Sequence, residues 1–420
     1  MKAQKVKWKK LDNASKIFPA TCNNIDTKVF RLSCQLYENV DPEILQEALE
    51  LTIDNFPLYR SVLRRGVFWY YFEFSDIKPK VEIENQPVCA PIYIRDNRNL
   101  LFNVTYYNNR LNLEVFHSLT DGTGVIWFME SLIYFYITSK YKDINSEIPK
   151  INYKASVSQK MDDSFEKIFT RAKRHGKGSA IKYKDAYIVE GTRLPEYRMS
   201  LIEGSMSAKE VLDLAHKYDT TMTIYLSSLL LYSIYKNMSS QSRNKPVVLS
   251  VPINLRQYFE SYTARNFFST MDIGYDFSKQ SHELKDIIHA VSDSFKANLS
   301  MEALEYHLYK LISLEKNPIA RIIPLTIKDS ALKIASYFND KGITSTISNI
   351  GRINMPPEFN PFIQQFSICV SSRRPQITMC SYGDRLVISF TSPFEETDIQ
   401  RTFFQFLSNN GVKVEIASNY

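Results

Sequence analysis

The spacing of apolar residues changes at residue 117. In residues 111–116 apolar side chains at odd positions alternate with mostly polar ones, which predicts a β-strand. In residues 125–136 apolar side chains recur at the spacing of one helical face, which predicts a helix. The segment between them, HSLTDGTG at residues 117–124, predicts a loop. His117 therefore directly follows a strand, in a loop that a rigid element holds on each side.

The same patterns predict a mixed sheet with helices over residues 1–145. Asp41 as an N-cap, followed by Pro42, predicts the start of a helix that runs to about residue 55. A polar turn at residues 108 and 109 joins two predicted strands, the second of which ends at His117. Further elements are a strand at 28–37, a hairpin at 61–74 and a strand at 99–107.

A second domain is predicted over residues 197–420, after a polar and loosely patterned crossover at 146–196. Its expected elements are a strand at 197–204, a buried helix at 223–237, a buried strand at 247–251 and two helices within 281–315. Residues 383–407 repeat the order of strand, polar loop and aromatic-rich helix seen at 109–136, with Ser392 where His117 stands. This predicts two halves of like fold with one active centre, carried by the first half.

Composition is typical of a globular protein. The chain has 420 residues, 44% of them apolar and 23% charged. A net charge of +7 is a modest bias that does not indicate nucleic acid and is compatible with an anionic substrate. Five scattered cysteines without a C-x-x-C pair, and an N-terminus without an apolar leader, predict a cytoplasmic protein with reduced thiols. The most apolar window, residues 222–235, is too short to span a membrane.

His117 and Asp121 are the residue types that proton transfer requires. A free imidazole has a pKa of about 6.5, so it is largely neutral at neutral pH. A neutral His117 is therefore able to accept a proton from a hydroxyl or amine that attacks a carbonyl. Asp121 and Gly122 suit a tight turn in which the glycine adopts a positive φ, and Asp121 is able to orient the loop or pair with a buried arginine. The structural alternative is a histidine that only packs at a strand end. Two ligands are too few for a metal site.

The segment HSLTDG at residues 117–122 resembles the HxxxDG signature of one acyltransferase superfamily. The superfamily includes chloramphenicol acetyltransferase, nonribosomal-peptide condensation domains, plant BAHD acyltransferases, bacterial alcohol acetyltransferases and polyketide-associated acyltransferases. Phe116 stands where condensation domains and many relatives have a second histidine, which favours the alcohol-acetyltransferase side. PINLR at 252–256 and SNIG at 348–351 are similar to two further superfamily segments and follow in the same order.

The resemblance implies two chloramphenicol-acetyltransferase-like α/β domains, with mixed sheets covered by helices, which form a pseudodimer around an interdomain tunnel. It implies that His117 is the general base and that Arg256 holds Asp121 in place, with Gly122 in the same turn. No metal and no permanently bound cofactor is implied.

The same resemblance implies a role for the SNIG segment. Ser348 and Asn349 would line the substrate or donate hydrogen bonds to the developing oxyanion, and an ordinary strand end with turn residues is the alternative.

The implied reaction moves an acyl group from acyl-coenzyme A, as co-substrate, to an alcohol or amine acceptor that attacks the thioester directly. A basic cluster at residues 171–184 is a candidate for attracting the phosphates of coenzyme A, and a solvated loop is the alternative. The chain is expected to act as a monomer. Two other functions stay open: transfer from an acyl carrier protein, as in stand-alone condensation or polyketide-associated enzymes, and a catalytically inactive relative that only binds.

Overall fold

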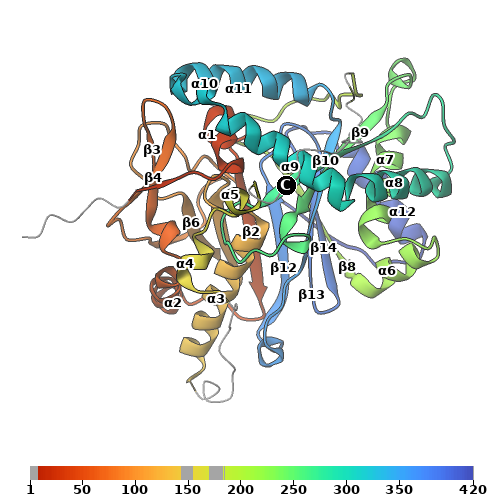
Figure 1. Ribbon diagram of the computed structural model, residues 1–420. Helices are drawn as coiled ribbons and strands as arrows, with labels where there is room; N and C mark the ends of the chain where they lie inside the picture. Colours follow the sequence, from red (N-terminus) through yellow and green to blue (C-terminus); the bar gives the residue numbers. More distant parts are fainter. Residues whose placement is uncertain (1–7, 143–154, 170–182, 184, 420) are drawn as a thin grey trace, which may run out of the picture.

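Two large sheets form the frame of the protein in the computed structural model, which describes residues 8–142, 155–169, 183 and 185–419 (Figure 1). The five-stranded sheet contains, in spatial order, β12 (Ile363–Val370), β2 (Val29–Leu36), β7 (Arg110–Phe116), β6 (Phe102–Tyr107) and β5 (Val81–Ile83). The seven-stranded sheet contains β10 (Phe268–Tyr275), β9 (Val247–Asn254), β11 (Ser345–Arg352), β13 (Gln376–Tyr382), β14 (Arg385–Ser392), β8 (Ser200–Ser207) and β15 (Glu415–Ser418). A three-stranded sheet contains β1 (Trp8–Lys10), β4 (Tyr70–Phe74) and β3 (Ser61–Arg65).

Helices cover these sheets. The first half carries α1 (Ile17–Thr21), α2 (Pro42–Asp54), α3 (Gly122–Lys140), α4 (Val157–Lys160) and α5 (Ser164–Phe169). The second carries α6 (Ala208–His216), α7 (Met222–Lys236), α8 (Leu284–Asn298), α9 (Met301–Lys316), α10 (Pro318–Ile322), α11 (Leu325–Asp340) and α12 (Asp398–Asn409). Short 3₁₀ turns occur at Ala14–Lys16, Pro57–Arg60, Ser240–Ser242, Leu255–Gln257 and Pro357–Phe359. None of the helices in the described ranges is long and apolar enough to cross a bilayer.

The local predictions for the first half are confirmed. β6 and β7 pair antiparallel around a turn in which Asn108 has φ +50°, a conformation that asparagine tolerates better than most residues. Asp41 caps α2 by accepting from the backbone N–H groups of Glu43 and Ile44, and Pro42 begins the helix. The hairpin formed by β3 and β4 is also present where the sequence predicts it.

The predicted helix after residue 125 forms α3, but its burial differs from the prediction. The apolar spacing predicts a single buried face, whereas residues on most sides of α3 are buried, including the polar Glu130 and Ser131. The reason is that α2 packs against one side of α3, the five-stranded sheet lies on another, and the backbone N–H of Asn354 from the second half donates to Glu130. A helix enclosed in this way loses the polar stripe that marks a surface helix.

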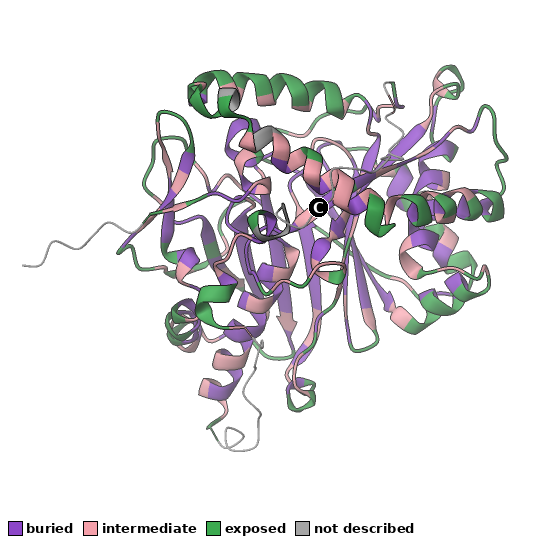
Figure 2. Cartoon of the chain, viewed as in Figure 1, coloured by how far each residue is buried: buried purple, intermediate pink, exposed green. Residues whose placement is uncertain are grey.

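The two halves are joined by more than their interface. β12 lies between the predicted boundary at residue 197 and the C-terminus, yet it pairs antiparallel with β2 in the sheet of the first half (Figure 1). Its sequence neighbours β11 and β13 both belong to the seven-stranded sheet. The sheets therefore do not divide at one point along the chain, and the second of the proposed domains contributes a strand to the sheet of the first. Figure 2 shows the buried strands of both sheets meeting in the middle of the molecule.

Because β12 comes from the second half of the sequence and completes the sheet of the first, we expect the two halves to unfold together. Trp8, Trp69 and Trp127, the only tryptophans in the sequence, all lie in the first half, so tryptophan fluorescence reports on that half while circular dichroism reports on the whole chain. Denaturant titrations followed by the two signals should coincide, because β12 cannot leave the first sheet without disturbing the second. Two separated transitions would contradict this coupling.

Candidate active site

His117 lies at the end of β7 among aromatic rings from both halves. Phe18 of α1 stacks on the imidazole with ring centres 4.4 Å apart, and Phe30 of β2 lies at 4.9 Å. Phe268, the first residue of β10, approaches from the second half at 5.5 Å. The backbone N–H of His117 donates to the carbonyl of Lys28 at 2.8 Å, which fixes the main chain. The ring is thus clamped in an apolar setting while the side chain keeps partial exposure.

Asn266 determines which ring nitrogen of His117 carries the proton. Its Nδ2 donates to the His117 carbonyl at 2.9 Å and to the hydroxyl of Ser15 at 3.0 Å, so the amide orientation is fixed. Its Oδ1 then faces His117 Nδ1 at 3.2 Å. Because an amide oxygen only accepts, Nδ1 must carry the hydrogen, and Nε2 is left with a free lone pair. The neutral tautomer that results has Nε2 as its basic atom.

Burial favours this neutral form. Removal of the imidazole from water lowers the pKa of His117 below its ordinary value, and the hydrogen bond to Asn266 and the nearby Asp121 carboxylate offset only part of this effect. The ring is consequently unprotonated at neutral pH, as a general base must be.

Arg256 and Asp121 form a buried ion pair between the halves. Arg256 Nη1 donates to Asp121 Oδ2 at 2.8 Å, and both side chains are less than one-tenth exposed. The rest of the guanidinium donates to the carbonyls of Thr263 and Arg265. Asp121 in turn caps α3 by accepting from Gly124 N–H, and its Oδ2 also accepts from Phe267 N–H at 2.8 Å. The pair is therefore fully hydrogen-bonded, which is the condition under which buried charges are stable.

Two further contacts attach the HxxxDG loop to the second half. The Thr120 hydroxyl donates to the carbonyl of Ala264 at 2.6 Å, and Asn254 Nδ2 donates to the Thr123 hydroxyl at 3.1 Å. Gly124 is required by this close approach, because a Cβ there would lie 2.1 Å from the carbonyl oxygen of Ala264. Residues 254–267 of the second half thus provide the contacts that hold residues 117–124 of the first.

Gly122 does not have the conformation that the sequence predicts. It is the first residue of α3, and its φ does not lie in the positive region, so the expected turn geometry is wrong at this position. The helix begins immediately after Asp121 because that residue acts as its N-cap. A Cβ on Gly122 would lie 3.0 Å from Ile350 Cγ2, so the small residue allows β11 to approach the start of α3.

Ser348 and Asn349 lie on β11, near this contact. Asn349 is exposed; its Nδ2 donates to the Thr223 hydroxyl at 3.0 Å and its Oδ1 accepts from Gly351 N–H. Ser348 is partly exposed, and its hydroxyl makes no hydrogen bond with another described residue. Ile350 is therefore the residue through which β11 approaches the start of α3, while the amide of Asn349 is hydrogen-bonded to Thr223.

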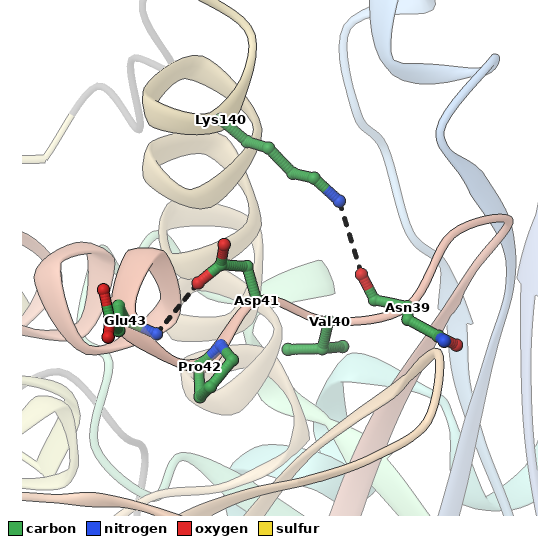
Figure 3. A pocket seen from close by; sticks show the side chains of 6 residues that line it. All are labelled: Asn39, Val40, Asp41, Pro42, Glu43 and Lys140. Carbon is green, nitrogen blue, oxygen red and sulfur yellow. Dashed lines mark hydrogen bonds between the residues drawn. The ribbon is translucent and has the colours of Figure 1, made fainter.

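Two surface pockets lie at the far end of α3, away from His117. The larger, of about 530 Å³, is lined by Asn39, Val40, Asp41, Pro42, Glu43 and Lys140. Figure 3 shows Lys140 Nζ reaching the carbonyl oxygen of Asn39, 3.3 Å away, and Asp41 accepting from Glu43 N–H. His117 and Asp121 line neither pocket, so the interdomain tunnel stays a prediction. In the described part of the chain no cluster of three potential metal ligands occurs.

Some site residues were not identified from the sequence. Asn266 is one of them, because nothing in the sequence around it shows that its side chain contacts His117. The sequence around Phe18 and Gly124 does not indicate their roles either. Phe18 stacks on His117, more than 90 residues away in sequence, and Gly124 allows the approach of Ala264, more than 130 residues away. The basic cluster at residues 171–184 lies outside the described residues except for Tyr183.

The fold is similar to that of several solved structures. Polyketide synthase associated protein 5 from Mycobacterium tuberculosis has 13% sequence identity and a TM-score of 0.62, with 95% of this chain and 96% of that chain covered. Trichothecene 15-O-acetyltransferase from Fusarium sporotrichioides has 10% identity and a TM-score of 0.62, with 96% and 94% covered. A mutant starter condensation domain of rhizomide synthetase in complex with C8-CoA has 10% identity and a TM-score of 0.62, with 97% and 98% covered.

These neighbours confirm the predicted fold. They are a polyketide synthase associated protein, an O-acetyltransferase and a condensation domain, and this chain has the same two-lobed mixed α/β architecture over nearly its whole length. No protein-family model matches the sequence, and no curated protein sequence matches it significantly.

The Arg256–Asp121 pair predicts a large loss of stability in Arg256→Met. This change leaves the Asp121 carboxylate buried without its cation, which should lower the free energy of unfolding by about 3 to 5 kcal/mol. Arg401→Met is the matched control, because Arg401 pairs with Asp398 at the surface, where such a pair contributes about 0.2 to 1 kcal/mol. Denaturant titration measures both. Equal small losses in the two variants would show that the buried pair is not a structural link.

Proposed function

We propose that this protein is an acyltransferase that moves an acyl group from acyl-coenzyme A to the hydroxyl or amine of an acceptor. The observation that carries the proposal is the environment of His117: a partly buried imidazole with a lowered pKa, held through Nδ1 by Asn266, in a loop that the Asp121–Arg256 pair fixes between the halves. The structural neighbours support it, since their names include an acetyltransferase and a condensation domain bound to C8-CoA.

In the proposed reaction His117 Nε2 accepts the proton of the acceptor while the acceptor oxygen or nitrogen attacks the thioester carbonyl. The tetrahedral intermediate then collapses, the carbon–sulfur bond breaks, and the coenzyme A sulfur takes the proton back from the imidazolium. No acyl-enzyme forms. The imidazolium that exists between these steps is stabilised by Asn266 Oδ1 and by the negative charge of Asp121.

Asp121 acts as a positioning residue in this mechanism. Both of its carboxylate oxygens already accept hydrogen bonds, Oδ1 from Gly124 and Oδ2 from Arg256 and Phe267. An oxygen saturated in this way does not abstract protons from a substrate. Its function is to hold the start of α3, and with it His117, against the second half.

For the oxyanion we propose Ser348 as the primary donor. Its hydroxyl is partly exposed and makes no hydrogen bond with another described residue, so it is able to reorient toward a developing negative charge. Asn349 stays in the proposal as a substrate-lining residue that must first release Thr223. We further infer domains at 1–145 and 197–420 joined by a crossover at 146–196, with β12 of the second domain completing the sheet of the first, together with a monomeric state and a cytoplasmic location.

The first prediction from this mechanism concerns His117→Ala. Release of free thiol from acyl-coenzyme A donors of increasing chain length, in the presence of a panel of alcohols and amines, should fall by about 10²- to 10⁴-fold. His216→Ala is the matched control, because His216 is an exposed histidine in the last turn of α6, in the other half of the protein from His117. Equal release by the wild type and His117→Ala would remove His117 from the mechanism. Activity only with a carrier-protein thioester would replace coenzyme A as the donor.

The second prediction concerns pH. His117 acts in its neutral form, and its pKa is lowered by burial. The rate therefore falls only when the pH drops below the depressed value, so the acid limb of kcat/KM should titrate below the ordinary histidine value of about 6.5. A pH series with one acyl-coenzyme A donor measures this limb. An acid limb centred above that value would contradict the assigned environment of the base.

A further inference from the structure

The outer face of α11 is apolar and exposed. Ile327, Ile334 and Phe338 recur at spacings of seven and four residues and are 58%, 59% and 64% exposed. The opposite face is the attached one, where Leu325 is buried and Asp329 accepts from the Tyr70 hydroxyl at 2.8 Å. Figure 2 shows the exposed side of this helix along one edge of the molecule. An apolar stripe about 16 Å long on the solvent side is the reverse of the usual arrangement of a surface helix.

The tip of the β3–β4 hairpin extends this face. Val67, Phe68 and Trp69 are all exposed, with Val67 at 71%. The tip is attached to the start of α11, because Leu325 N–H donates to the carbonyl of Val67 at 2.8 Å. Lys328 Nζ donates to the carbonyl of Phe68 at 2.9 Å. Figure 1 shows the hairpin beside the α10 end of α11. We call residues 67–69 together with the exposed side of α11 the apolar edge.

The charges around the apolar edge are separated by sign. Both acids of α11 are turned inward: Asp329 toward Tyr70 and Arg65, and Asp340 to Arg373 at 2.8 Å. The cations next to the exposed aromatic side chains point to solvent. Lys341 is exposed with Nζ 4.7 Å from the ring centre of Tyr337, and Lys10 is exposed with Nζ 5.9 Å from that of Trp69. Lys328 instead donates to the hairpin, and Lys333, four residues after Asp329, lies on the attached side of the helix. The edge therefore presents apolar side chains with a rim of positive charge.

We propose that the apolar edge is a peripheral binding surface for an anionic lipid bilayer. Aromatic and aliphatic side chains on one face of a helix that lies parallel to the surface, beside lysines whose stems extend along them, are the features that place a helix in a membrane interface. A second copy of this chain fits less well, because a twofold contact through the edge would bring Lys10 and Lys341 of each copy into the same interface, while both acids of α11 are turned inward.

The apolar edge is close to His117. α11 packs against α1, and Phe18 of α1 stacks on the imidazole. Only α11 itself and the short helix α1 would thus lie between a bilayer at the edge and the proposed base. This part rests on the proposed function: it assigns the acceptor to lipophilic alcohols or amines that partition into a membrane.

The test is flotation of the full chain with vesicles, which requires no catalysis. The protein should float with vesicles of equal parts phosphatidylcholine and phosphatidylglycerol and far less with phosphatidylcholine alone, and added salt should weaken the binding. The variant Ile327→Gln, Ile334→Gln, Phe338→Gln should bind about a hundredfold more weakly, because three apolar side chains no longer insert. Glutamine keeps the helix propensity of α11.

The matched control is Leu51→Gln, Ile83→Gln, Ile416→Gln, which changes three aliphatic side chains that are 48%, 55% and 55% exposed and belong to α2, β5 and β15. It should bind vesicles as the wild type does. A charge variant, Lys10→Glu with Lys341→Glu, should lose about fivefold for each lysine removed, whereas Lys217→Glu with Lys236→Glu should not.

Three results would overturn the proposal: no binding to anionic vesicles, equal loss of binding in the control, or a dimer in sedimentation that the α11 variant converts to monomer. The last would assign the edge to a second copy. Since vesicle binding is measured without substrate, its failure is distinct from failure of the acyl-transfer assay.

Discussion

The ion pair between Asp121 and Arg256 is the constraint on which the site depends. It joins the start of α3 in the first half to the turn after β9 in the second, across 135 residues of sequence. Two opposite charges removed from water are stable only when all their hydrogen bonds are made, so the pair determines the positions of the surrounding carbonyls and of Phe267 N–H. Asn266 is adjacent to Phe267, and its contact with His117 follows from that placement.

The interface between the halves is polar elsewhere as well. Arg110 of the first sheet donates to both carboxylate oxygens of Glu203 in the second at 2.7 Å, and to the hydroxyl of Ser367 on β12. Partly buried polar contacts of this kind add little net stability but permit few alternative arrangements. A general base needs a defined orientation more than it needs tight packing. The polar interface and the pairing of β12 with β2 supply that defined orientation.

The fold and part of the site could be predicted from the sequence because their signals are local or are carried by short motifs. The strand, loop and helix around His117 follow from the spacing of apolar residues, and the pairing of Arg256 with Asp121 follows from the resemblance of PINLR. The role of Asn266 could not be predicted, since no pattern states which side chain of another segment reaches the imidazole. Gly122 was assigned to a turn because glycine tolerates positive φ, whereas capping by Asp121 starts the helix at Gly122, three residues before the predicted residue 125.

The most direct test of this account is the protonation state of His117, measured by ¹⁵N NMR of the histidine ring nitrogens, with His117→Ala to assign the signal among the six histidines. At neutral pH the spectrum should show a neutral ring with hydrogen on Nδ1 and a free lone pair on Nε2, and Asn266→Ala should lose this single tautomer. A ring that is protonated on both nitrogens at neutral pH, or that carries its hydrogen on Nε2, would contradict the claim that the contact between the halves prepares His117 as a base.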